Sequence, residues 1–132
     1  MSIQSCTPLL NVADCERSLV FYRDVLGFKV TSTWDEDGKV AWAELRSGPV
    51  KLMLNGRGGD PGHRFARPPY RDAVICLGVE SVHALSARLR RLGYQAPEPE
   101  AQEYGLDEIV IRDPDGYDLA LSSPTDLSRR SG

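Results

Sequence analysis

The sequence predicts an α+β protein made of two tandem βαβββ units, which together form a cupped, partly open mixed sheet with helices on its outer face. Three observations support this prediction. The chain has 132 residues, which is most simply one domain. A strand, a helical stripe and further strands follow one another, and the same order then restarts. The two copies align at an offset of 66 or 67 residues, and such a repeat is firmer evidence than local propensity.

The first copy covers about residues 6–55. It begins with a strand at 7–13, where Pro8 is typical of a sheet edge or a strand start. A helix follows, because apolar residues recur at helical spacing between an N-cap, Asp14, and a helix-ending glycine, Gly27. These apolar residues are Cys15, Leu19, Tyr22 and Leu26. Three further strands are predicted at 28–34, 39–46 and 51–55.

The second copy covers about residues 73–123, and a tail at 124–132 follows it. Before it, residues 56–72 are rich in Gly, Pro and Arg without a period, so we expect a linker or a mobile loop there. Ser81 is the N-cap of the second helix, and Gly93 ends it. The apolar stripe of this helix is Val82, Leu85, Leu89 and Leu92. The strands predicted in this copy are 73–79, 107–112 and 117–123, with an unpatterned, proline-containing stretch at 94–105.

The composition excludes two classes of partner. The net charge is −3 and the pI is about 5.4, whereas a nucleic-acid-binding protein needs a basic face. We interpret Arg88, Arg90 and Arg91 as the solvated side of the second helix. No apolar run approaches the roughly 18 residues that span a bilayer, and the N-terminus has no secretory signal pattern. We therefore expect neither nucleic acid nor a membrane as partner.

The cysteines bear on the cellular compartment. Cys6, Cys15 and Cys76 are odd in number and lack CxxC spacing, which argues against a disulfide framework or a zinc knuckle. We expect buried free thiols in a reducing environment, and hence a cytoplasmic protein.

Two motifs, VADCERSLVFYRDVLGF (12–28) and IRDPDGYDLAL (111–121), carry a family resemblance, and VESVHALSARLRRLGY (79–94) adds to it more weakly. Through them the sequence resembles the vicinal oxygen chelate superfamily, which includes glyoxalase I, extradiol dioxygenases, fosfomycin-resistance enzymes and bleomycin-resistance binding proteins. The resemblance covers about residues 6–123. It is specific for the superfamily but not for one activity, because this superfamily hosts many chemistries.

The resemblance implies four places for metal ligands, two in each βαβββ unit, which relatives usually fill with His, Glu or Gln. In this sequence they are Thr7, Met53, Val74 and Ala120. The repeat supports the placement, because the first and second copies of these positions share one offset of 67. None of the four is a normal ligand for a divalent ion. We therefore expect no bound metal, no other cofactor and no Lewis-acid catalysis.

Displaced ligands are the alternative to this expectation. His63 lies in the Gly/Pro-rich segment, and His83 lies just off the apolar stripe of the second helix. We expect both to be surface histidines. An unusual metal site of His63, Glu44 and Glu108 stays open as an alternative, although nothing in the spacing favours it.

Strand alternation assigns side chains to faces once Met53 is taken to face the cup. Lys51 and Asn55 then share its face, while Leu52 and Leu54 pack under the helix. The neighbouring strand should turn Val40, Trp42, Glu44 and Arg46 toward the cup and Ala41, Ala43 and Leu45 toward the helix. The matching residues of the second copy are Glu108, Val110 and Arg112, with Asp118 and Ser122 beside Ala120.

Such a mixture suits an organic ligand with aromatic or planar parts, held by stacking and a few polar contacts. The expected ligand-binding residues are Trp34, Trp42, Glu44, Met53, Asn55, Tyr104, Glu108 and Ala120. Alternatively, Trp42 serves dimer or core packing, and the two glutamates are surface carboxylates. If buried, Glu44 and Glu108 could also act as general acid or base with raised pKa values.

Three functional hypotheses follow. The leading one is a metal-free binding protein of the bleomycin-resistance type that sequesters a drug or metabolite, with the cup at the interface of a homodimer, as the resemblance implies. The second is a glyoxalase-like lyase, isomerase or dioxygenase, with non-standard metal ligands or with metal-independent acid–base catalysis by Glu44 and Glu108. The third is a domain that acts only through protein contacts.

Overall fold

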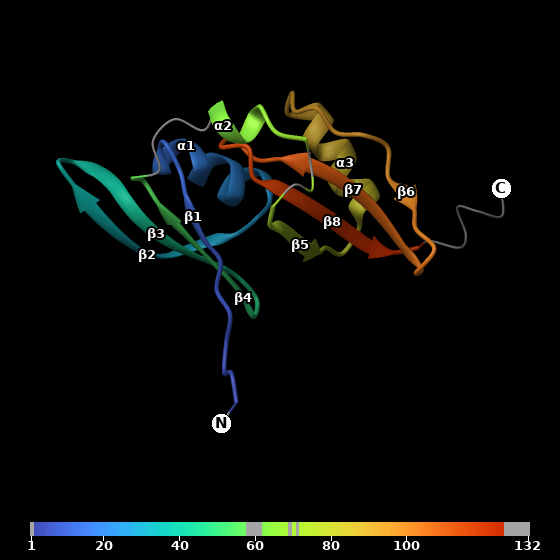
Figure 1. Cartoon of the computed structure of the whole chain (residues 1–132), viewed down its shortest axis with the longest axis horizontal. Coiled ribbons are helices and arrows are strands. Elements are labelled where there is room, and N and C mark those ends of the chain that lie inside the picture. Colours follow the sequence, from blue (N-terminus) through green and yellow to red (C-terminus); the bar gives the residue numbers. More distant parts are fainter. Residues whose placement is uncertain (1, 58–61, 69, 71, 126–132) are drawn as a thin grey trace. The chain divides into compact units, whose positions relative to one another are not determined.

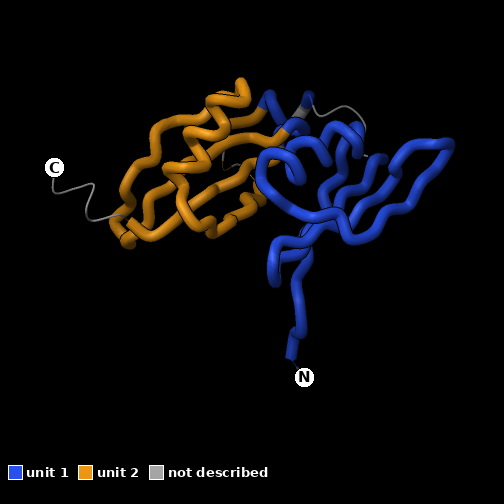
Figure 2. Tube along the Cα trace, turned by 180° about the vertical axis from the view of Figure 1, so that it is seen from behind, with its two compact units in different colours: residues 1–66, 114–116 blue, residues 67–113, 117–132 orange. Residues whose placement is uncertain are grey.

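The computed structural model describes residues 2–57, 62–68, 70 and 72–125. The chain divides into two compact units, coloured separately in Figure 2. Unit 1 contains residues 1–66 and 114–116, and unit 2 contains residues 67–113 and 117–132. Each unit holds one four-stranded mixed sheet and one main helical segment. The predicted α+β class with tandem βαβββ units is confirmed.

The sheet of unit 1 has the strand order β1-β4-β3-β2 (Figure 1). Its strands are β1 (Leu9–Asn11), β2 (Lys29–Glu36), β3 (Lys39–Ser47) and β4 (Val50–Asn55). Strand β1 runs parallel to β4, and the other neighbours are antiparallel. Ala43, Leu45, Leu52 and Leu54 are at most 4 % exposed, because the helical segment 15–25 packs on their face. The predicted alternation of these four residues is confirmed.

The helical segment of unit 1 changes type halfway. It begins as an α-helix, α1 (Cys15–Leu19), and continues as a π-helix, η1 (Val20–Val25). Thirteen positions separate the N-cap Asp14 from Gly27, whereas twelve separate Ser81 from Gly93 in the second copy. A π-helix winds more residues into each turn, so it accommodates the extra residue without displacing the strand that follows. The decrease of the repeat offset from 67 to 66 along the helix has its physical origin here.

A turn from the second copy completes unit 1. Asp115, in the Pro114–Gly116 segment, is fully buried against the start of α1. Its carboxylate accepts the Ala13 N–H at 2.7 Å and the Ser18 hydroxyl at 3.1 Å. Gly116 has φ +84° and leaves no room for a side chain, since an added Cβ would lie 2.8 Å from the Cβ of Arg64.

The sheet of unit 2 has the order β5-β8-β7-β6. Its elements are β5 (Val74–Gly78), α3 (Val82–Arg91), β6 (Glu100–Ala101), β7 (Leu106–Arg112) and β8 (Asp118–Pro124). Helix α3 is capped by the Ser81 hydroxyl, which accepts the Ala84 N–H, and it packs on β7 and β8. The buried side chains beneath it are Ile109, Ile111, Leu119 and Leu121. Strand β6 lies in the proline-containing stretch, where no strand was located from the sequence.

The segment 56–72, expected to be a linker or a mobile loop, contains a four-residue helix, α2 (Gly62–Phe65). Residues 58–61, 69 and 71 of this segment, and the predicted tail from residue 126 onward, lie outside the described part of the chain. Among the described helices, none has the length and apolar character needed to cross a membrane.

Candidate functional site

The sheet of unit 1 has one face opposite the helical segment 15–25, which we call the open face. Strand register arranges its side chains in three rows that cross the strands. The tryptophan row is Trp34, Trp42, Asn55 and Asn11. The glutamate row is Ser32, Glu44, Met53 and Leu9. The basic row is Lys29, Arg46 and Lys51.

The structure thus brings five of the predicted site residues onto one face. Trp34 and Trp42 are direct partners across β2 and β3, as are Glu44 and Met53 across β3 and β4. Trp34 is 65 % exposed, whereas Trp42 and Met53 are half-buried. Asn55 donates from Nδ2 to Oδ1 of Asn11 at 3.0 Å, which orients its amide. This face offers two indole rings beside a thioether and fixed polar groups.

Glu44 is held as a carboxylate. Lys51 Nζ and Arg46 Nη2 each lie 3.1 Å from its Oε1. The hydrogen bond from Lys51, followed by that from Arg46, lowers the pKa of Glu44 below its usual range despite some desolvation. The prediction of a raised pKa, on which an acid–base role for Glu44 depended, is therefore wrong. The lowered pKa is caused by Lys51 and Arg46, which strand alternation places on the same face as Glu44.

Near the tip of the β2–β3 hairpin the alternation fails. A register shift follows Trp34, so that Asp35 pairs with Val40. Val40 and Ala41, expected on opposite faces, both line one pocket instead. A bulge of this kind adds a residue to one strand and reverses the side-chain direction after it.

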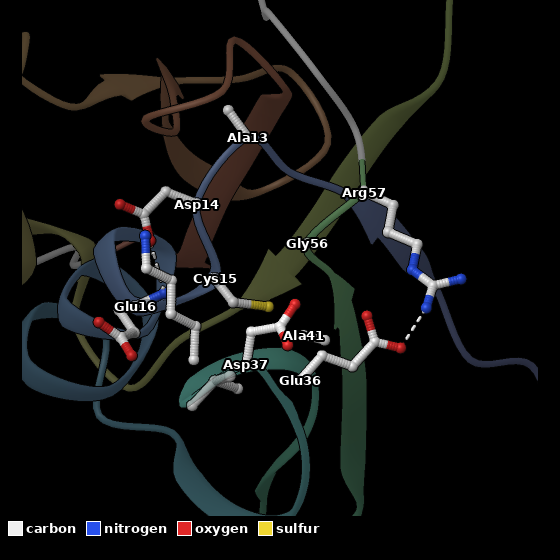
Figure 3. A pocket seen from close by; sticks show the side chains of 11 residues that line it. Ala13, Asp14, Cys15, Glu16, Glu36, Asp37, Ala41, Gly56 and Arg57 are labelled. Atoms are coloured by element: carbon white, nitrogen blue, oxygen red, sulfur yellow. Dashed lines mark hydrogen bonds and ion pairs between the residues drawn. The ribbon is translucent and has the colours of Figure 1, made fainter.

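That pocket lies in unit 1, between the start of α1, the β2–β3 hairpin and the end of β4 (Figure 3). Its volume is about 460 Å³. It is lined by Ala13, Asp14, Cys15, Glu16, Glu36, Asp37, Lys39, Val40, Ala41, Gly56 and Arg57. Arg57 pairs with Glu36 at its edge, and the Cys15 thiol points into it. Burial and nearby carboxylates raise the pKa of Cys15 to about 11, so this thiol stays protonated and unreactive at neutral pH.

The pocket was not predicted from the sequence. Its walls come from three chain segments that carry no common motif, and the bulge that turns Val40 into it has no sequence signature. Its side chains include four carboxylates against two cations, Lys39 and Arg57.

The second sheet has its own face opposite α3, where two predicted residues meet. The hydroxyl of Tyr104 donates to Glu108 Oε2 at 3.1 Å, and that of Tyr70 approaches Oε1 at 3.5 Å. Burial raises the pKa of both phenols, and the Glu108 carboxylate raises it further. The two tyrosines therefore remain protonated donors at neutral pH.

Tyr70 contacts two residues of this face. Its backbone N–H donates to Asp118 Oδ2 at 3.3 Å, and its hydroxyl reaches Glu108. Ala120 lies between the Asp118 and Glu108 positions in the register of β7 and β8, and it is 3 % exposed. Tyr70 adopts φ +64°, a left-handed conformation that costs a residue with a side chain about 1–3 kcal/mol. Sequence reasoning missed Tyr70, because it lies in an aperiodic segment.

The four implied ligand positions do not provide a metal site. Met53 has Leu9 and Glu44 as strand neighbours, and Ala120 has Cys76 and Val110. Thr7 and Val74 offer neither an imidazole nor a carboxylate. Within the described ranges, no three His, Cys, Asp or Glu side chains come together as ion ligands do. The donor chemistry at these positions does not fit a divalent ion.

One of the two histidines, His83, is already paired with a carboxylate. His83, expected at the surface, is partly buried, and its Nε2 lies 2.8 Å from Oδ2 of the buried Asp107. The side chain of His63 lies outside the described part of the chain. Glu44 and Glu108 belong to different units, so the alternative His63–Glu44–Glu108 site stays untested.

Comparison with known proteins agrees with this fold. A sequence model of the Glyoxalase/Bleomycin resistance protein/Dioxygenase superfamily matches residues 2–121. A lactoylglutathione lyase of Salmonella typhimurium is 27 % identical over 135 residues, covering 94 % of this chain and 95 % of that protein. TnmS3, described as an antibiotic binding protein from Streptomyces sp. CB03234, has a TM-score of 0.68 at 23 % identity, with 95 % and 99 % of the two chains covered. A bleomycin resistance determinant encoded on the transposon Tn5 has a TM-score of 0.67 at 22 % identity, with 94 % and 100 % covered.

At these identities the two structural likenesses show the fold alone. The family match extends over nearly the whole chain and includes both motifs that carried the resemblance. The chain belongs to the glyoxalase/bleomycin resistance protein/dioxygenase superfamily.

Proposed function

We propose that this protein is a metal-free small-molecule binding protein that sequesters a partly aromatic drug or metabolite on the open face of unit 1. The observation that carries the proposal is the tryptophan row beside the glutamate row. Two indoles that are direct cross-strand partners offer aromatic rings for stacking, and Met53 adds a polarisable side chain in the neighbouring row. Glu44 and Asn55, each held by a neighbour, are the orienting polar contacts.

The misfit of the four ligand positions supports binding over metal-dependent chemistry, because none offers an oxygen or nitrogen donor that such ions prefer. The descriptions of TnmS3 and of the Tn5 determinant, as proteins that concern antibiotics, agree with the proposed class of ligand. Within unit 2, and separately from the open face of unit 1, we propose Tyr104 and Glu108 as polar contacts for a ligand on the second sheet. Ala120 is only 3 % exposed and therefore offers little surface to a ligand.

Intrinsic fluorescence tests the proposal directly, because the chain has only two tryptophans and both are in the tryptophan row. A panel of aromatic and glycopeptide antibiotics is titrated into the protein while tryptophan emission and the heat of binding are recorded. We expect at least one compound to bind stoichiometrically and to shift the emission. Uniformly absent binding would refute the proposal, and binding without an emission change would place the ligand elsewhere.

We further propose a homodimer in the cytoplasm. Strand β2 ends the strand order of its sheet, and seven of its eight residues are exposed, so its outer edge is open to a second copy. Three free cysteines suit a reducing compartment. Sedimentation equilibrium tests the dimer, and a monomer at every concentration would contradict it.

A second candidate is a lyase, favoured by the sequence likeness to lactoylglutathione lyases. Two measurements separate it from binding alone. Metal analysis of the purified protein should find no stoichiometric ion, and an assay for lactoylglutathione formation or breakdown should find no turnover. Stoichiometric Ni, Zn, Fe or Mn together with turnover would establish the lyase instead.

A further inference from the structure

We propose that the ligand of the open face is an anion, a planar aromatic molecule that carries a carboxylate, sulfonate or phosphate group. This inference rests on the proposed function and specifies its ligand class. The tryptophan row takes the aromatic body, and the basic row takes the anionic group.

The basic row places three cations in direct register. Lys29 is the partner of Arg46 across β2 and β3, and Arg46 is the partner of Lys51 across β3 and β4. Like charges directly opposite each other destabilise a sheet, so this row opposes the local rules of strand pairing. Departures of this kind are expected where a site has been shaped for a ligand.

One carboxylate offsets these charges only in part. Among the residues of the three rows, the charged side chains are Lys29, Arg46, Lys51 and Glu44, which leaves a local excess of two positive charges. Arg46 and Lys51 both bond the same oxygen of Glu44, yet their side chains remain 50 % and 36 % exposed. The chain as a whole carries a net charge of −3, so this positive group runs against the overall balance. Exposed guanidinium N–H groups are suited to carboxylate and phosphate oxygens.

The spacing of the rows sets the size of the ligand. Trp42 and Arg46 are four residues apart on β3, which corresponds to about 13 Å along an extended strand. The arginine side chain reaches over roughly half of this distance, and the apolar part of the glutamate row, Met53 and Leu9, lies between. A bicyclic aromatic ring with one anionic substituent therefore spans the tryptophan row and the basic row.

Three probes with one aromatic body test the inference by isothermal titration: 2-naphthoate, the neutral 2-naphthamide and the cationic 2-naphthylmethylammonium. We expect 2-naphthoate to bind about tenfold more tightly than 2-naphthamide, because a charge-assisted hydrogen bond is stronger than a neutral one. The ammonium probe should bind most weakly. High salt should remove most of this preference, because the cations are exposed.

A charge-matched pair of variants locates the effect. The double substitution Lys29→Gln with Arg46→Gln removes two cations and leaves Lys51 paired with Glu44. It should abolish the preference for 2-naphthoate while the affinity for 2-naphthamide stays the same. The control, Lys39→Gln with Arg57→Gln, removes two cations of unit 1 that line the pocket of Figure 3, and it should keep the preference.

Equal affinities for the three probes, or tightest binding of the ammonium probe, would overturn the anionic ligand. Loss of the preference in the control double variant would also overturn it, because long-range charge would then be the cause. The proposed function fails separately, when neither these probes nor the antibiotic panel changes tryptophan emission. Circular dichroism of both double variants verifies that each one is folded.

Discussion

Replacing Asp115 by alanine should destabilise unit 1 strongly, although the residue lies in a turn between two strands. Its carboxylate has no exposed surface, and it accepts hydrogen bonds from the Ala13 N–H and the Ser18 hydroxyl. The alanine variant leaves both donors without this acceptor. Arg17 Nη2 lies 3.5 Å from the same carboxylate, but its side chain is 49 % exposed, so solvent screens that pair and it adds little.

The magnitude follows from the two hydrogen bonds. A hydrogen bond to a charged group contributes about 1.5–3 kcal/mol, and the partial exposure around Ala13 favours the lower end for that bond. The expected loss of unfolding free energy is therefore about 3–4 kcal/mol. For a chain of this length, that loss corresponds to a decrease in Tm of roughly 10 °C. Asp115→Asn keeps one carbonyl acceptor and the shape of the side chain, so its loss should be about half as large.

Urea denaturation and thermal melting followed by circular dichroism measure these losses. The control is Asp24→Ala, since Asp24 is an exposed carboxylate that bonds its exposed neighbour Arg23 and should be replaceable without a measurable change. A loss below about 0.5 kcal/mol for Asp115→Ala, as is usual for surface positions, would refute the anchoring role. An equal loss in the control would refute it as well.

Two further predictions concern titratable groups. Glu108→Gln should lower the pKa of Tyr70 and Tyr104, because removing the carboxylate makes each phenolate less unfavourable. A spectrophotometric titration near 295 nm should then show that tyrosine ionisation begins at lower pH. An unchanged titration curve would contradict the contact between Glu108 and the two tyrosines. Cys15 should be protected from Ellman's reagent at pH 8, since its pKa is about 11 and it is 2 % exposed. The exposed Cys6 and Cys76 should react quickly. Three fast-reacting thiols in the native protein would contradict the protection of Cys15.

Features that follow from periodicity could be predicted from the sequence. The repeat predicted two tandem βαβββ units, and the period of two placed Ala43, Leu45, Leu52 and Leu54 under the helical segment. The same period placed Trp42, Glu44 and Met53 together on the other face, because a strand whose one face is buried has a fixed register.

Features that break a period were not predictable. The π-helix appears in the sequence only as a one-residue change of offset, and the bulge near Val40 leaves no trace. Tyr70 bonds Asp118 and Glu108 from a segment that has no pattern. The lowered pKa of Glu44 depends on how the flexible side chains of Lys51 and Arg46 settle, and strand alternation says nothing about that.

The central claim, a ligand stacked on the tryptophan row, is tested most directly by one comparison of affinities. Whichever compound binds the wild type is titrated calorimetrically into Trp42→Leu and into Phe65→Leu, which removes a half-exposed aromatic ring of α2. Loss of aromatic contact at Trp42 is worth about 1.5 kcal/mol, so we predict roughly tenfold weaker binding to Trp42→Leu and unchanged binding to Phe65→Leu. Equal affinity of Trp42→Leu and the wild type would contradict the claim.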